Sequence, residues 1–333
     1  MKKLVNDPED VVREATEGFG LAHPALVTVS TDPLFVARAS GPVAGRVGIV
    51  SGGGSGHEPL HGGFVGHGML GAAVPGPVFT SPTPDPIVAA TLAADGGAGV
   101  LHVVKNYTGD VLNFETAADL AQAEGVEVAT VVVDDDVAVR DSLYTAGRRG
   151  VAGTVVVEKL AGAAAERGDS LEQVAEVARR AVAETRTLGV ALAAGTVPHV
   201  GEPSFTLADD EIEIGIGIHG EPGRERIPLE PADRVVDRML GPVLEDLGVA
   251  SGDEVLLFVN GMGGTPLVEL YVVFRRAAQV LAEQGVTVTR SLVGNFVTSL
   301  EMQGASITVT RLDAASTELW DAPVETAALR WGR

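Results

Sequence analysis

Three glycine-rich segments of the chain carry ionisable side chains that could do chemistry. Residues 51–59 contain four glycines followed by a histidine, residues 105–110 contain a lysine and an aspartate, and residues 215–223 contain a second histidine. Each segment follows an apolar run that is typical of a strand. Because open α/β sheets bind ligands at the carboxyl ends of their strands, we expect the three segments to form one composite site.

Histidine and aspartate are the residue types that acid–base and covalent chemistry use. A neutral imidazole such as that of His57 or His219 can act as a nucleophile or a base, and the Asp110 carboxylate can take a proton from a hydroxyl. The glycines beside them let backbone amides approach a small ligand, since no Cβ stands in the way. Each segment also has a structural interpretation, as a tight strand-to-helix turn or, for Asp110, a helix cap. The three together favour a site.

Two short motifs occur in these segments without the context that their chemistry requires. Residues 57–61 match H-E-x-x-H, but zinc binding needs both histidines on one face of a continuous helix, and glycines and a proline crowd this stretch. A zinc hydrolase using His57 and His61 is an alternative that this context argues against. Residues 215–220 match G-x-G-x-x-G, but prolines follow where a dinucleotide site needs a helix. None of the four lysines follows a glycine, which excludes a Walker A loop. We therefore predict that this chain binds no nucleotide and no metal.

The elements that must position these residues alternate between short apolar runs and longer amphipathic ones, the pattern of a mainly parallel sheet with helices. In the first part of the chain the predicted strands are residues 46–50, 99–104, 126–133 and 154–157, and the predicted helices are 85–95, 114–124 and one capped by Ser170 and Gln173 that runs to about Leu188. In the second part the predicted strands are 211–218, 254–259 and 286–293, with a helix over 266–283. We therefore predict two domains, residues 1–185 and 186–333.

Composition limits the possible partners and location. A chain of 333 residues with 45% hydrophobic residues can bury the cores of two domains. The net charge of −21 disfavours nucleic acid and anionic membranes, and the absence of cysteine excludes disulfides and thiolate chemistry. No apolar run follows the N-terminus as in a signal peptide, and no stretch of about 18 apolar residues occurs. We expect a cytoplasmic protein.

Longer stretches of the sequence resemble the sugar-binding half of the dihydroxyacetone kinase family. They are residues 52–59, 79–85, 105–115 and 217–223, with further similarity in 142–150, 203–207 and 319–323. These stretches occur in order and the match covers essentially the whole chain, so they are far more specific than the short motifs. The resemblance implies an α/β fold with a Rossmann-like three-layer first domain on a parallel sheet and a second, smaller α/β domain with a mixed sheet. It also implies a homodimer.

By this resemblance the chain is the dihydroxyacetone-binding subunit of a phosphotransferase that acts on an alcohol group. His219 would attack the ketone carbon and hold the sugar as a hemiaminal, Asp110 would be the general base, and His57 would be a second acid/base group that contacts the substrate. The positions that match those holding the sugar's oxygens are Gly54, Ser55, Gly56 and Lys105, and Ser81 would line the same pocket.

The resemblance also implies a second polypeptide. In single-chain members a helical nucleotide-binding domain follows the sugar-binding half, whereas this sequence stops soon after that half. We expect magnesium and ADP or ATP on a separate helical subunit, recharged by a phosphotransferase-system phosphocarrier or by exchange with ATP. The expected substrate is dihydroxyacetone or a related small ketose or aldose. The alternative is a non-catalytic, dihydroxyacetone-binding transcriptional coactivator, and the presence of both His57 and Asp110 argues against it.

Overall fold

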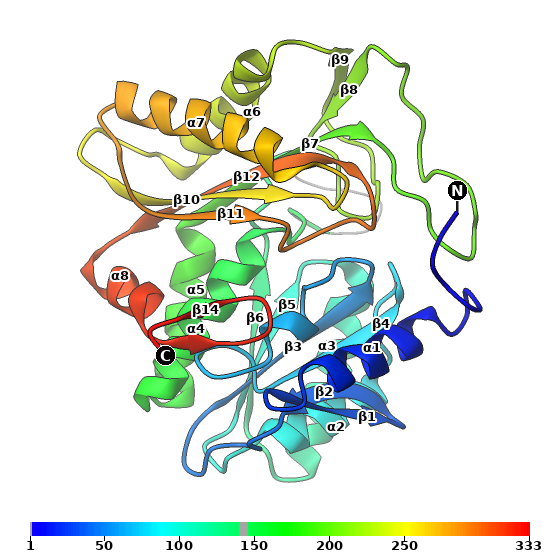
Figure 1. Cartoon of the computed structure of the whole chain (residues 1–333). Helices are drawn as coiled ribbons and strands as arrows, with labels where there is room; N and C mark the ends of the chain where they lie inside the picture. The colour runs from blue at the N-terminus through cyan, green and yellow to red at the C-terminus, as the bar shows by residue number, and fades with distance from the viewer. Residues whose placement is uncertain (1, 140–145) are drawn as a thin grey trace.

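Two six-stranded sheets form the framework of the protein (Figure 1). The computed structural model describes residues 2–139 and 146–333, so the first part of the 142–150 stretch lies outside the described residues. The strand order is β1-β2-β4-β3-β5-β6 in the first sheet and β11-β10-β12-β7-β8-β9 in the second.

The first sheet is parallel at its centre and antiparallel at one edge. Its strands are β1 (Val27–Thr31), β2 (Leu34–Arg38), β3 (Gly48–Ser55), β4 (Ala72–Val78), β5 (Val100–Lys105) and β6 (Val128–Val133). Strands β4, β3, β5 and β6 pair in parallel, whereas β1 and β2 form an antiparallel pair and β2 runs antiparallel to β4. The predicted parallel-sheet layer is thus present, and the antiparallel edge was not predicted.

Helices cover both faces of the first sheet, as a three-layer fold requires. The elements are α1 (Val11–Ala22), the 3₁₀ turn η1 (Gly62–Phe64), α2 (Pro84–Ala94), α3 (Thr108–Ala123), α4 (Gly153–Arg167) and α5 (Leu171–Ala183). Successive residues of each central strand contribute to opposite faces: Val50 packs with α2 and α3, and Ile49 with α4 and α5. Both faces being apolar explains the nearly continuous hydrophobic runs in these strands.

The second sheet is mixed, as predicted. Its strands are β7 (Thr185–Ala193), β8 (Glu211–Ile214), β9 (Glu225–Pro228), β10 (Glu254–Gly261), β11 (Thr287–Gly294) and β12 (Gln303–Leu312). The β10–β11 pair is parallel and the other neighbouring pairs are antiparallel. Helices α6 (Ala232–Leu247) and α7 (Leu267–Glu283) cover the face that lies uppermost in Figure 1. None of the described helices is long and apolar enough to cross a membrane.

Helix α4 lies between the two sheets and is buried along most of its length. It contacts β3, β5 and β6 of the first sheet and β7 and β12 of the second. The strand predicted at residues 154–157 is wrong, because these residues belong to α4. The helix predicted to reach Leu188 is also wrong beyond Ala183, since β7 begins at Thr185. The Ser170–Gln173 capping box at the start of α5 is confirmed.

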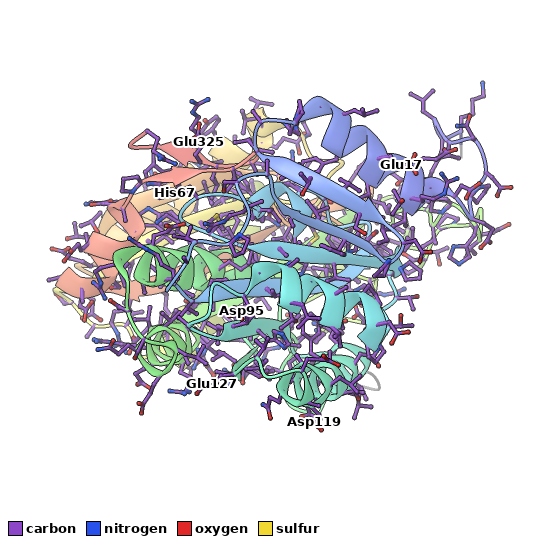
Figure 2. The ribbon with its side chains drawn as sticks, turned by 90° about the horizontal axis from the view of Figure 1, so that it is seen from below. Glu17, His67, Asp95, Asp119, Glu127 and Glu325 are labelled. Atoms are coloured by element: carbon purple, nitrogen blue, oxygen red, sulfur yellow. The ribbon has the colours of Figure 1, made fainter. Side chains whose placement is uncertain are left out.

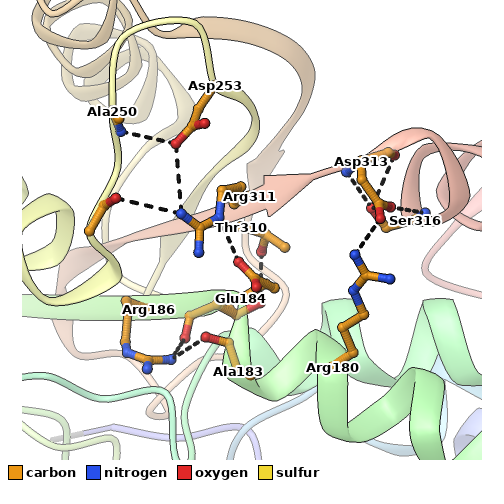
Figure 3. Close-up of polar contacts among 12 residues, drawn as sticks. Arg180, Ala183, Glu184, Arg186, Ala250, Asp253, Thr310, Arg311, Asp313 and Ser316 are labelled. Atoms are coloured by element: carbon orange, nitrogen blue, oxygen red, sulfur yellow. Dashed lines mark hydrogen bonds and ion pairs between the residues drawn. The ribbon is translucent and has the colours of Figure 1, made fainter.

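Ion pairs join the C-terminal end of α5 to the end of strand β12 and to Asp313, which follows it (Figure 3). Arg180 on α5 pairs with Asp313, and Arg311 Nε donates to Glu184 Oε2 at 2.7 Å. After β12, helix α8 (Ala314–Asp321) contacts α4, and the short strands β13 (Val324–Glu325) and β14 (Arg330–Trp331) return to the first sheet's side. The division of the chain at residue 185 stays a prediction.

Acidic side chains project from the underside of the first sheet's layers (Figure 2). Asp119 and Glu127 are exposed there, whereas Glu325 lies beside His67, with which it forms an isolated β-bridge. Exposed carboxylates such as these contribute to the net charge of −21, although a few carboxylates, among them Asp136 and Glu221, are buried.

Candidate active site

Aromatic and imidazole rings from four strand ends meet at one place. The ring centroid of His219 lies 4.8 Å from that of His57, 4.6 Å from that of Tyr107 and 5.3 Å from that of Phe79. His57 follows β3, Tyr107 lies between β5 and α3, Phe79 follows β4, and His219 follows β8. The structure therefore brings the three predicted segments together.

The glycine-rich part of the first segment belongs to a strand and not to the turn that we predicted after Val50. Strand β3 continues to Ser55 and pairs with β4 through Gly54, opposite Gly76. A Cβ on Gly54 would lie 2.5 Å from the backbone nitrogen of Thr80, so this close approach requires glycine. Ser55 Oγ donates to the Gly76 carbonyl at 2.7 Å, and the Gly56 amide donates to the Glu58 carboxylate at 3.0 Å.

His57 presents one ring nitrogen as an unused acceptor. Its Nδ1 lies 2.7 Å from the carbonyl oxygen of Thr298, which can only accept, so Nδ1 carries the hydrogen. Its Nε2 is buried and has no partner within the described residues. Burial, followed by the charges of His219 and Lys105, holds the pKa of His57 well below 6.5. The imidazole is therefore neutral near pH 7, with a lone pair on Nε2.

Lys105 and Asp110 lie together at the end of β5 and the start of α3. Lys105 Nζ lies 3.4 Å from Asp110 Oδ2 and 3.3 Å from the Gly52 carbonyl oxygen, and both side chains are almost fully buried. Asp110 Oδ1 has no partner within the described part of the chain. The first turn of a helix also favours a carboxylate, because the unpaired amides there carry partial positive charge. Asp110 thus has one oxygen fixed and one available.

His219 is held by a carboxylate two residues further along the chain. Its Nδ1 donates to Glu221 Oε1 at 2.8 Å and its backbone amide donates to Glu221 Oε2 at 2.9 Å. Burial alone would raise the pKa of Glu221, but the adjacent His219 imidazole and the Arg149 guanidinium lower that pKa to about 2. An ionised Glu221 keeps the hydrogen of His219 on Nδ1, which leaves the lone pair of Nε2 for a ligand.

A buried ion pair supports Glu221 from behind. Arg149 is fully buried and its Nε donates to Asp136 Oδ2 at 2.7 Å. A Cβ on Gly217 would lie 2.0 Å from Glu221 Oε2 and 2.6 Å from Arg149 Nη1, so glycine is required between the two side chains. Arg149 is thus fixed by Asp136 on one side and acts on Glu221 through its charge, across the position of Gly217.

Several residues of this site were not assigned from the sequence. Glu221 had a local signal, since it stands two residues from His219 in a glycine-rich segment, but Thr298 is 241 residues from His57 and had none. Arg149 and Tyr107 lie in stretches that carried the resemblance without being given a role. Ser81, predicted to line the pocket, faces Gly109, the neighbour of Asp110: a Cβ on that glycine would lie 2.7 Å from Ser81 Oγ.

The H-E-x-x-H stretch does not have the geometry of a zinc helix. Residues 57–61 form turns, and the ring Nδ1 atoms of the two histidines are engaged in different places, His57 with Thr298 and His61 with Glu158. No group of three or more potential metal ligands was found among residues 2–139 and 146–333.

The Dak1 domain model matches residues 17–328. The chain belongs to the Dak1 family. The dihydroxyacetone-binding subunit DhaK of the PEP-dependent dihydroxyacetone kinase of Escherichia coli (strain K12) is 52% identical, with both chains covered completely. The corresponding subunit of PTS-dependent dihydroxyacetone kinase 1 of Listeria innocua is 51% identical over 98% of this chain and 100% of its own length. The predicted membership of the dihydroxyacetone kinase family is confirmed.

Solved structures of this Dak1 family share the fold. The dihydroxyacetone kinase operon co-activator Dha-DhaQ aligns with a TM-score of 0.88 and 35% identity, over 95% of this chain and 96% of its own. The dihydroxyacetone kinase from C. freundii in complex with AMP-PNP and Mg²⁺ aligns with the same TM-score and identity, over 99% of this chain and 61% of its own. The predicted α/β architecture is confirmed, and the chain corresponds to part of that longer kinase.

Proposed function

We propose that this chain is the dihydroxyacetone-binding subunit of a dihydroxyacetone kinase, which captures the ketone on His219 and presents a hydroxyl for phosphorylation. The observation that supports this most directly is the pair of hydrogen bonds from His219 to Glu221, which directs the His219 Nε2 lone pair into the site beside His57. The dihydroxyacetone-binding subunits among the relatives supply the substrate class.

In the capture step, a bond forms between His219 Nε2 and the ketone carbon, and the π electron pair of the carbonyl moves to its oxygen. That oxygen takes up one proton from the bulk solvent and becomes a hydroxyl, so the adduct carries the single positive charge of the substituted imidazole. The positive charge that develops on the imidazole is balanced by the Glu221 carboxylate, which already accepts from Nδ1. A covalent step of this kind discriminates against glycerol, which has hydroxyls of similar placement but no carbonyl.

In the transfer step, Asp110 takes the proton from the hydroxyl whose oxygen attacks the phosphoryl group. Its Oδ1 atom is available for this, because Lys105 engages Oδ2. His57 Nε2 is a second acceptor, suited to a substrate hydroxyl. Lys105 and the backbone of Gly54, Ser55 and Gly56 would hold the sugar's oxygens.

The phosphoryl donor, with ADP or ATP and magnesium, would be carried by a separate helical subunit, with a phosphotransferase-system phosphocarrier as the source of the phosphoryl group. The names of the bacterial relatives, PEP-dependent and PTS-dependent, favour this source over ATP. Charge stabilisation at the transferred group would then come largely from the partner. We also propose that the chain acts as a homodimer in the cytoplasm, with domains 1–185 and 186–333, and size-exclusion chromatography with light scattering tests the dimer.

A second candidate function is a dihydroxyacetone-binding coactivator without catalysis. It is favoured by the structural similarity to the Dha-DhaQ co-activator. The presence of His57 and Asp110, each with an unengaged polar atom directed away from its protein partners, supports the kinase subunit instead.

Carbon-13 NMR tests the capture step on the isolated chain. Dihydroxyacetone labelled at its carbonyl carbon, added to protein with nitrogen-15 histidines, should lose the ketone signal and show a one-bond coupling between that carbon and a histidine nitrogen. His219→Ala should abolish the coupling, whereas His199→Ala, a change at an exposed histidine, should leave it intact. A bound sugar that keeps its ketone signal in the unmodified protein would contradict the role of His219.

A further inference from the structure

Two buried ionisable residues next to the candidate site have no role in the proposed capture and transfer steps. His61 is the second histidine of the H-E-x-x-H stretch, and Glu158 lies on the central helix α4 with no exposed surface. His61 Nδ1 lies 2.6 Å from Glu158 Oε1 and 3.0 Å from Ser51 Oγ, and its Nε2 lies 3.1 Å from Lys105 Nζ. The imidazole therefore connects α4 to the lysine of the site.

The donors and acceptors in this hydrogen-bond network follow from Ser51 and Lys105. Ser51 Oγ donates its single hydrogen to the Val103 carbonyl at 2.7 Å, so it can only accept from His61. The Lys105 ammonium group can only donate, so His61 Nε2 accepts. The hydrogen of His61 is then on Nδ1, and Glu158 Oε1 accepts it.

Lys105 consequently has one acceptor for each of its three hydrogens: His61 Nε2, the Gly52 carbonyl and Asp110 Oδ2. The His61 contact is the shortest of the three. If His61 carried its hydrogen on Nε2, two donors would face each other between buried side chains, and Lys105 would lose an acceptor. The acceptors at Glu158 and Ser51, of which Glu158 is the nearer to Nδ1, disfavour this tautomer.

Glu158 does not need to be ionised to act in this way. Burial, opposed by the charge of Lys105, raises the pKa of Glu158 to about 8. The carbonyl oxygen of the neutral acid accepts from His61 Nδ1 as a carboxylate oxygen does. A glutamine at this position would reproduce the same acceptor.

We propose that Glu158 and His61 are positioning residues, which fix the His61 tautomer and thereby hold Lys105 in the orientation that orders Asp110 and the substrate's oxygens. Neither residue touches the reacting atoms. The kinetic part of this proposal rests on the proposed function, because it concerns phosphoryl transfer to the captured sugar. The tautomer of His61 does not depend on that function.

Nitrogen-15 NMR of the full chain tests the tautomer without any assay of activity. The His61 ring should carry its hydrogen on Nδ1 in the unmodified protein and in Glu158→Gln, and should populate the Nε2 form in Glu158→Leu. A hydrogen on Nε2 in the unmodified protein would overturn the proposal, whatever the protein's reaction is.

Two matched pairs of variants, assayed with the nucleotide-carrying subunit, test the positioning. Glu158→Leu and His61→Met remove an acceptor, and kcat should fall about 10- to 100-fold, the range for a lost hydrogen bond to a charged group. Glu158→Gln and His61→Gln restore an amide oxygen as acceptor, and kcat should recover to within about 3-fold. If Glu158 and His61 served only the stability of the fold, the variants would lower stability, and kcat would not recover selectively in the amide variants. Equal kcat values for the amide and apolar variants would overturn the proposal. If the apolar variants do not fold, a large loss of kcat in Glu158→Gln with the His61 tautomer unchanged would overturn it instead.

Discussion

Two acceptor atoms in the candidate site, His57 Nε2 and Asp110 Oδ1, are buried without a partner in the described residues, as are the hydroxyl of Tyr107 and Nη1 of Arg149. The opposite atoms of the two acceptors are fixed: His57 Nδ1 donates to Thr298 and Asp110 Oδ2 accepts from Lys105. An unsatisfied buried acceptor costs free energy, so its persistence favours a ligand that supplies the missing donor. Substrate hydroxyls would satisfy both atoms.

The availability of Asp110 Oδ1 predicts a separation of binding from turnover. Asp110→Asn preserves size and most hydrogen bonds while removing the base, so dihydroxyacetone binding should survive. With saturating partner subunit, kcat should fall by roughly 10² to 10⁴, the range for losing a positioned general base. Calorimetry of the variant with dihydroxyacetone, beside steady-state transfer, measures the two effects.

Such a loss in kcat with affinity retained is the signature of an interaction made in the transition state. A coactivator has no transfer step to lose, so the same variant also distinguishes the two candidate functions. Near-normal turnover in Asp110→Asn would place the base elsewhere, and His57 Nε2 would be the next atom to test.

The sequence predicted the segments that carry the site better than the contacts that hold them. His57, Asp110 and His219 stand in glycine-rich stretches that follow apolar runs, and this pattern together with the family resemblance marked them as candidates. Thr298 and Glu158 stand in stretches with no such feature, and they reach the site through the fold. A hydrogen bond across 241 residues leaves no trace in local periodicity.

The reactive groups lie at strand ends. The boundaries of these strands were predicted well where both faces of the sheet are buried. Strands β5 and β10 agree with their apolar runs within two residues. The error at residues 154–157 has the same origin: α4 is packed between two sheets, so it has no polar face, and a run of valines in it has the pattern of a buried strand. Strand β3 extends past Val50 through glycines, which local propensity disfavours in strands.

A histidine on β5 away from the site predicts how acid destabilises the first sheet. His102 is fully buried, and its Nε2 donates to Thr91 Oγ1 at 2.8 Å, since Thr91 gives its own hydrogen to Ile87. Burial lowers the pKa of His102 to about 4. Because the folded protein holds the neutral form, its stability should be complete above pH 6.5 and decrease as the pH falls from 6.5 towards 4.

Urea unfolding at pH 7 and pH 5 measures this effect. His102→Leu removes the titration and leaves the Thr91–Ile87 bond, so the unmodified protein should lose about 2 kcal/mol more than the variant between these pH values. His199→Leu, at an exposed position, should behave like the unmodified protein. Equal losses in His102→Leu and in the unmodified protein would show that His102 does not titrate in this way.

The site forms where the two sheets meet, because residues that follow β11 lie against those that follow β3. Leu300 and Thr298 donate backbone hydrogen bonds to Gly56 and His57, at 2.7 and 3.2 Å. The residues proposed to contact the sugar also come from both halves: His219 lies in a loop of the second sheet, whereas Lys105 and Asp110 lie on β5 and α3 of the first. A captured sugar would therefore add contacts to both halves of the chain at once.

This arrangement predicts that dihydroxyacetone stabilises the protein as one unit. At a concentration of about 100 times Kd, binding to the folded state alone adds about 2.7 kcal/mol. With an unfolding entropy of about 2.1 cal/mol/K per residue, a chain of 333 residues should show a rise in Tm of about 4 °C. Differential scanning calorimetry with and without the sugar measures the shift. Glycerol at the same concentration should give no comparable shift, nor should the sugar with His219→Ala. Two transitions, with one of them moved by the sugar and the other unchanged, would show that the ligand's contacts are confined to one half, because a ligand held by both sheets must be released before either can unfold.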